Sequence, residues 1–171
     1  MVASQAEIMK HAISEEYLIF MRLALDEARL AAAAGEVPVG AILIAEGAII
    51  ARAHNQREAL QDPTAHAELI AIRQAASHLG SWRLTGSALY VTMEPCAMCV
   101  GAAILARVER IVFGAWDAKA GACGSIMNIP EERRLNHRLE IVGGVLEEES
   151  RELLQGFFQG LREKLPLNAN R

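Results

Sequence analysis

The sequence has 171 residues, of which 52% are hydrophobic and 22% are charged, and its formal net charge is −4. A chain of this size and composition predicts one globular domain with a full hydrophobic core. Its apolar runs fall short of the roughly 18 residues that a transmembrane helix needs, and its net negative charge excludes nucleic-acid binding by bulk charge alone.

The termini and the cysteines indicate the cellular compartment. Glu7 and Lys10 interrupt the stretch where a signal peptide would be apolar. Three cysteines, two of them in a C-x-x-C pair, give no even-numbered disulfide framework and favour reduced thiols that bind metal. We therefore expect a cytoplasmic protein with a flexible N-terminal extension over residues 1–13 and a single domain over residues 14–171. Cys123 is interpreted as a small buried apolar side chain.

The first elements in chain order are a helix and a hairpin. Ser14 can cap a helix that we expect to run to Ala34, since Glu15 and the next glutamate favour the positive end of the helix dipole. Two β-rich runs follow, at residues 39–45 and 49–54, separated by Glu-Gly-Ala. Their continuous apolar character predicts a hairpin of buried strands.

The next element is a helix that carries two polar residues of interest. Asp62 and Pro63 together indicate a helix start, with the aspartate as the cap and the proline at the first helical position. The apolar pattern carries this helix to Gly80. We expect His66 and Glu68 to lie in its first turn.

The second half of the chain continues to alternate strands and helices. The pattern predicts strands at 88–93, 110–114 and 139–143 and helices at 96–106 and 147–164. Strands and helices that alternate within one domain predict an α/β fold, a three-layer α/β/α sandwich around a mixed five-stranded sheet.

One histidine and two cysteines have the spacing of a metal site. Cys96 and Cys99 lie three residues apart at the start of a predicted helix, on one face, where backbone N–H groups favour thiolates. Together with His66 they form a set of zinc ligands that leaves a fourth position open to water. The sequence therefore predicts a catalytic zinc site.

Glu68 follows the histidine by two residues and can act as the proton carrier of such a site. Zinc lowers the pKa of a bound water from 15.7 to about 7. A nearby carboxylate can accept the proton of this water and pass it to a leaving group. Hydrolytic deamination of an amidine carbon, as in adenine or cytosine, needs that combination.

Longer stretches around these residues resemble one family. The H-x-E and P-C-x-x-C motifs are the signature of the zinc-dependent cytidine and deoxycytidylate deaminase superfamily. Within it, the chain resembles the bacterial tRNA-specific adenosine deaminases at residues 37–41, 62–68, 89–96, 113–115, 117–119 and 136–138. The resemblance covers most of the chain. It implies a cytidine deaminase-like fold, a homodimer, and conversion of adenosine to inosine at the wobble position of a tRNA anticodon loop.

The resemblance also implies roles for individual residues. The zinc ligands of the family, one ion per subunit, fall on His66, Cys96 and Cys99. Its proton shuttle falls on Glu68.

Three further residues are implied as substrate contacts. Asn55 would hydrogen-bond the target nucleotide, and Asp117 would meet the sugar-phosphate of the neighbouring nucleotide, where a carboxylate can accept from a 2′-hydroxyl. Phe158 would lie near the flipped-out loop bases. Two features depart from the family pattern: Trp116 stands where a polar or basic residue is expected, and the C-terminal helix is only weakly basic.

Other functions fit parts of the same pattern. The first alternative is a deaminase of a free base or nucleoside, of the guanine or cytosine type. The second is a structural zinc module in which His54, His137 or Cys123 supplies a fourth ligand. The third is an RNA-binding protein without catalysis.

Overall fold

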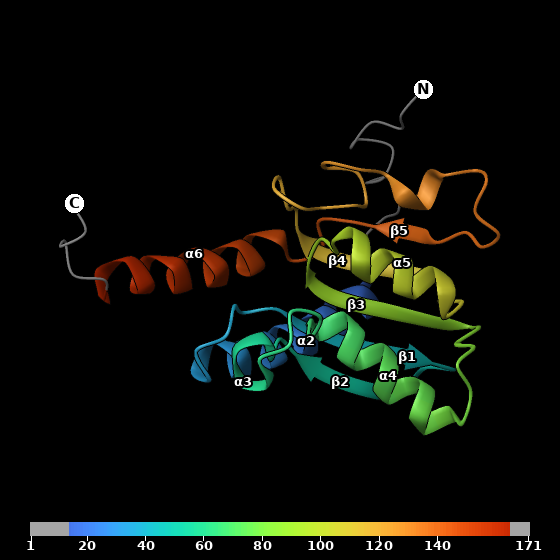
Figure 1. The fold of residues 1–171 in the computed structure, drawn as a ribbon, viewed down its shortest axis with the longest axis horizontal. Coiled ribbons are helices and arrows are strands. Elements are labelled where there is room, and N and C mark those ends of the chain that lie inside the picture. Colours follow the sequence, from blue (N-terminus) through green and yellow to red (C-terminus); the bar gives the residue numbers. More distant parts are fainter. Residues whose placement is uncertain (1–13, 165–171) are drawn as a thin grey trace.

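The structure of the protein, a computed structural model, describes residues 14–164 (Figure 1). The predicted N-terminal extension, residues 1–13, and residues 165–171 lie outside the described residues. The elements are α2 (Glu15–Ala33), β1 (Gly40–Ala45), β2 (Ala48–His54), α3 (Arg57–Leu60), α4 (Ala67–Leu79), β3 (Ser87–Met93), α5 (Ala97–Leu105), β4 (Arg110–Ala115), the 3-10 turn η1 (Ile129–Glu131), β5 (Glu140–Val142) and α6 (Glu147–Lys164). No helix within residues 14–164 has the length and apolar character to cross a membrane.

The five strands form one mixed sheet, as predicted. Their order is β2-β1-β3-β4-β5. Strand β1 is antiparallel to both β2 and β3, whereas β4 runs parallel to β3 and β5 runs parallel to β4. Helix α5 makes the crossover between β3 and β4, whereas β4 and β5 are connected by the long loop that contains η1.

Helices cover both faces of the sheet, which confirms the three-layer arrangement. Leu43, Leu89 and Ile111 face the core beneath α4 and α5. Neighbouring residues on the same strands, Ile42 and Tyr90 among them, face the core beneath α2, because side chains alternate along a strand. Helix α6 begins against β4 and extends away from the body of the molecule (Figure 1).

Helix α4 begins later than predicted, and the reason is local. The side chain of Asp62 does not cap the helix; its carboxylate accepts the backbone N–H and the hydroxyl of Thr64, at 2.8 and 2.7 Å, and closes a separate turn. The first helical residue is Ala67, with His66 at the N-cap position in extended backbone. Placing His66 in the first turn was therefore wrong by one residue, whereas Glu68 does lie there.

Strand β2 is an edge strand and not a fully buried one. Only β1 pairs with it, and Ala48 and Ile49 at its start are exposed. A continuous apolar run does not distinguish a central strand from an edge strand, and this explains the difference. The short helix α3 and the turn η1 were not predicted, because such short elements show no periodicity.

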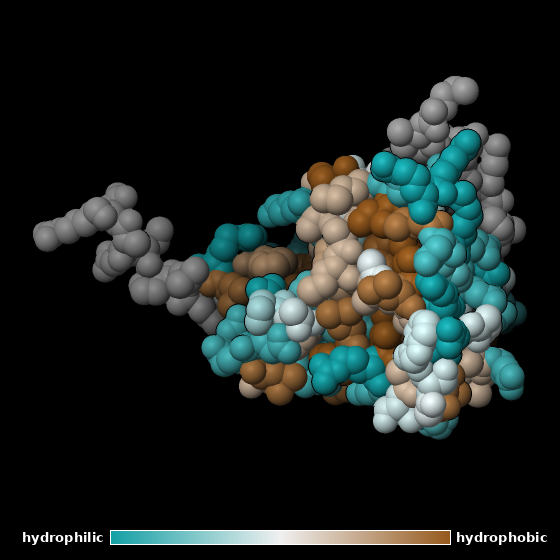
Figure 2. Space-filling view, turned by 45° about the vertical axis from the view of Figure 1, so that its right-hand side comes forward, coloured by the Kyte–Doolittle hydropathy of each residue, from teal (hydrophilic) through white to brown (hydrophobic). Residues whose placement is uncertain are grey.

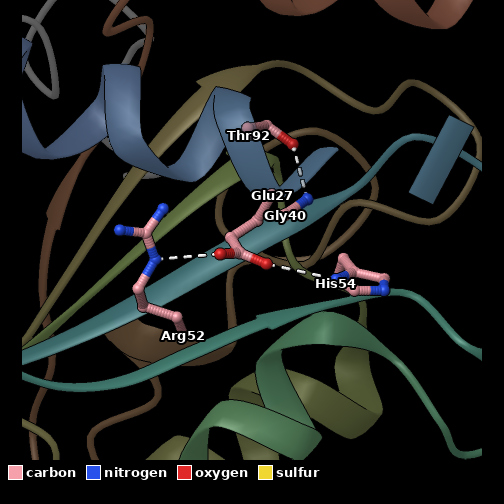
Figure 3. A network of polar contacts seen from close by, with 5 residues as sticks. All are labelled: Glu27, Gly40, Arg52, His54 and Thr92. Carbon is pink, nitrogen blue, oxygen red and sulfur yellow. Dashed lines mark hydrogen bonds and ion pairs between the residues drawn. The ribbon is translucent and has the colours of Figure 1, made fainter. Parts of the chain in front are cut away.

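A buried glutamate ties α2 to the end of β2 (Figure 3). The carboxylate of Glu27 accepts the Nε–H of Arg52 at 2.8 Å, and its second oxygen lies 3.1 Å from Nδ1 of His54. Nearby, the backbone N–H of Gly40 donates to the Thr92 hydroxyl at 3.2 Å (Figure 3). Asn55, the residue that follows β2, donates its own backbone N–H to the carbonyl oxygen of Val39 at 3.0 Å.

Candidate metal centre and active site

The three predicted ligands meet where the N-termini of two helices converge. His66 is the N-cap residue of α4 and Cys96 is the N-cap residue of α5, while Cys99 lies in the first turn of α5. Nδ1 of His66 lies 3.8 Å from Sγ of Cys96 and 3.5 Å from Sγ of Cys99, and the two sulfurs are 3.7 Å apart. These three residues are placed to bind a metal ion.

The spacing of these atoms fits zinc. Tetrahedral zinc, with bonds of about 2.3 Å to sulfur and about 2.05 Å to nitrogen, separates two sulfur ligands by about 3.75 Å and sulfur from nitrogen by about 3.55 Å. The three measured distances all lie close to these values. The donor set, two thiolates and one imidazole, is also one that zinc prefers.

The protonation of the ligands suits a cation as well. Hydrogen bonds from Cys99 and from His66 lower the pKa of the Cys96 thiol to about 3. The hydrogen bond to Cys96 and burial raise the pKa of Cys99. Zinc ligation requires both thiols in the thiolate form, so a bound cation would release their protons.

Glu68 lies in the same cavity as the ligands and is almost fully enclosed. Its side chain is buried, with 4% of the residue exposed. Burial raises the pKa of its carboxyl group above the ordinary value. The structure thus brings together the ligands and the predicted proton carrier.

The cavity beside the ligands has a volume of about 220 Å³, which suits one small aromatic ring. Asn55 and Asp117, both predicted as substrate contacts, lie on its wall, and Arg57 stands at its rim. Its lining residues are Val37, Val39, Asn55, Arg57, His66, Glu68, Met93, Glu94, Cys96, Asp117 and Ala120.

Phe158 lies in a different cavity from the ligands. This neighbouring cavity, of about 460 Å³, is formed by α6 and the loop after β4, and Trp116, Lys119 and Arg162 also line it. Trp116 lies edge-on against Phe113, with ring centroids 4.7 Å apart. The unexpected tryptophan is therefore half-buried against the sheet and also faces this second cavity.

Two buried glutamates that sequence reasoning missed hold the walls of the ligand cavity. Glu94 accepts the backbone N–H groups of Asp117, Cys123 and Ser125 at 2.9, 3.0 and 3.1 Å, and also the Ser125 hydroxyl. Glu36 contacts the side chain of Asn55.

The alternative of a structural zinc module needs a fourth protein ligand, and its candidates have other positions. Nδ1 of His54 faces Glu27, and Nε2 of His137 lies 2.6 Å from the carbonyl oxygen of Val108. Cys123 is fully buried, as predicted. Within residues 14–164, the cluster that could hold a metal contains the three predicted ligands and no fourth.

Known proteins are similar to this chain in both sequence and fold. The cytidine and deoxycytidylate deaminase zinc-binding region matches residues 14–115. A tRNA-specific adenosine deaminase of Bacillus subtilis (strain 168) is 53% identical over 146 residues, which is 85% of this chain and 91% of the relative. A tRNA-specific adenosine deaminase of Aquifex aeolicus (strain VF5) is 49% identical over 153 residues, which is 90% of this chain and 99% of the relative.

A solved structure with a similar fold also belongs to a tRNA deaminase. It comes from studies of A-to-I editing by tRNA:A34 deaminases at the wobble position of transfer RNA, and its TM-score is 0.77 at 46% identity, over 80% of this chain and 99% of that chain. The chain therefore belongs to the zinc-dependent cytidine and deoxycytidylate deaminase family, among the tRNA-specific adenosine deaminases.

Proposed function

We propose that this protein deaminates adenosine to inosine at the wobble position of a tRNA anticodon loop. The observation that carries the proposal is the meeting of His66, Cys96 and Cys99 beside the buried Glu68 in a cavity the size of one base. The function of the relatives favours this substrate over a free base or nucleoside.

His66, Cys96 and Cys99 would hold the zinc ion, which when bound supplies a water of lowered pKa. Glu68 accepts a proton from the attacking water as the oxygen bonds to C6 of adenine, and it delivers this proton to N1 of the ring. It then moves the second water proton to the exocyclic amine, the C6–N bond breaks, and ammonia leaves. One carboxylate serves both transfers, because it is regenerated at the end of each.

The target adenine must leave its stack to enter the cavity. Turning a base out costs a few kcal/mol and least in a single-stranded loop, which favours hairpin loops over duplex. Asn55 contacts the target nucleotide, and Asp117 accepts from a 2′-hydroxyl of the neighbouring nucleotide.

The second cavity supplies a place for further loop nucleotides. Trp116 and Phe158 offer aromatic faces, and Lys119 and Arg162 offer positive charge. Aromatic stacking combined with cations is how proteins hold unpaired bases and their phosphates.

The enzyme is a cytoplasmic homodimer in this proposal, since transfer RNA is its substrate and large apolar side chains remain exposed. Figure 2 shows hydrophobic surface gathered in a band on one face. Exposed apolar side chains include Leu60 on α3, Leu105 at the end of α5 and Met127 in the loop after β4. Burial of such surface against a second copy would stabilise a dimer. Sedimentation equilibrium should therefore give twice the chain mass of 18.6 kDa.

The test compares inosine formation on three substrates: an anticodon stem-loop RNA, the same RNA with its loop closed into a duplex by a complementary strand, and free nucleosides. We expect inosine from the open loop and much less from the duplex. Activity confined to free compounds would refute the tRNA substrate, and equal rates on loop and duplex would refute base flipping from a loop.

A further inference from the structure

Glu36 carries a buried carboxylate that the reaction described above does not use. Only 1% of the residue is exposed, and within residues 14–164 no basic side chain forms an ion pair with it. One carboxylate oxygen accepts the backbone N–H of Ala59 at 2.7 Å. The other lies 3.3 Å from Nδ2 of Asn55. Glu36 thus connects helix α3 to the amide that stands on the wall of the ligand cavity.

The contact defines which way round the amide of Asn55 sits. An ionised carboxylate accepts hydrogen bonds and donates none, so the atom that faces it must be the amide nitrogen. Asn55 therefore uses one N–H on Glu36, and its second N–H and its Oδ1 remain for other partners. Within the described chain Oδ1 has no hydrogen-bond partner, and it is not sealed from solvent.

We propose that Glu36 is a positioning residue that fixes the orientation of the Asn55 amide, and therefore which hydrogen-bond donor and acceptor Asn55 presents to the substrate base. This proposal rests on the function proposed above, in which Asn55 contacts the target nucleotide. A side-chain amide can turn over with almost no change of shape, and doing so exchanges a donor for an acceptor. Glu36 prevents this exchange, because the turned-over amide would place Oδ1 against the carboxylate.

Glu36→Gln inverts the arrangement at nearly constant volume. The N–H of Ala59 is a donor and cannot change, so the new side chain must turn its oxygen toward Ala59 and its NH₂ group toward Asn55. Asn55 must then turn over to offer Oδ1. We expect kcat on stem-loop RNA to fall by about tenfold or more, with KM changed by less than about threefold, since the contacts to the rest of the loop are unaltered.

Three measurements accompany the kinetics. Zinc content of Glu36→Gln should stay at that of the wild type, because the ligands are not touched. Asn55→Asp alone places two carboxylates in contact and should lower the melting temperature. The double variant Glu36→Gln/Asn55→Asp restores a donor facing an acceptor, and it should regain at least about half of that loss. Glu58→Gln, an exposed substitution on the short helix α3 that removes the same charge, is the control for the effect of charge alone.

The results separate this proposal from the proposed function. A double variant that melts no higher than Asn55→Asp would overturn the assigned polarity, whatever the activity. A Glu36→Gln enzyme as active on RNA as Glu58→Gln would overturn the positioning role. If the wild type deaminates no RNA, the proposed function fails and the positioning role fails with it, whereas the melting temperatures still decide how the amide is held.

Discussion

Removing the buried carboxylate of Glu94 should destabilise the protein strongly. Glu94 is 3% exposed and accepts four hydrogen bonds, from three backbone N–H groups and one hydroxyl in the loop 117–125. In Glu94→Ala these buried donors lose their partner, at a cost of about 1–3 kcal/mol each when water cannot replace it. Because the vacated space admits some water, we expect a total of about 3 kcal/mol.

The change can be measured by thermal unfolding of the zinc-loaded protein. For a chain of this length, about 3 kcal/mol lowers the melting temperature by about 6–12 °C. The matched control is Glu109→Ala, since Glu109 is exposed and accepts a single backbone N–H, from Gly86 at 3.1 Å. We expect that control to shift the melting temperature by less than about 2 °C. Equal shifts for the two variants would refute the assignment of Glu94 as the residue that holds this loop.

Two further predictions concern packing and metal. In Gly40→Ala the new Cβ would lie 2.1 Å from the carbonyl oxygen of Ala24, so α2 must move. Urea denaturation should show that the free energy of unfolding falls by about 3 kcal/mol. The control is Gly156→Ala on α6, where nothing lies within 4 Å of the new Cβ, and this change should be neutral or slightly stabilising. Cys99→Ala removes one of three ligands, and elemental analysis should find zinc lost together with activity; a variant that keeps zinc at the wild-type level would contradict the ligand assignment.

The ligands could be predicted from the sequence because they lie in two short motifs, each at the start of a helix. His66, Cys96 and Cys99 come together as expected, and Glu68 shares their cavity. The order of strands and helices was also predictable from apolar runs and turn residues, and most boundaries differ from the structure by one residue.

Other features depend on contacts between distant parts of the chain, which no local pattern reveals. The start of α4 was predicted wrongly, because Asp62 uses its carboxylate in a turn of its own. Glu36 and Glu94 look like ordinary surface charges in the sequence, yet each is buried against backbone N–H groups far along the chain. Phe158 was expected near the loop bases, and that expectation stays a proposal, since it lines the second cavity and not the one that holds the ligands.

The role of Glu68 as proton carrier is tested by comparing zinc content and inosine formation in the wild type and in Glu68→Ala, with the exposed Glu58→Ala as control. We expect Glu68→Ala to keep zinc and fold while inosine formation on stem-loop RNA falls by about a thousandfold, because the proton carrier is gone. A Glu68→Ala enzyme that forms inosine within about threefold of the wild-type rate would show that Glu68 is not the proton carrier.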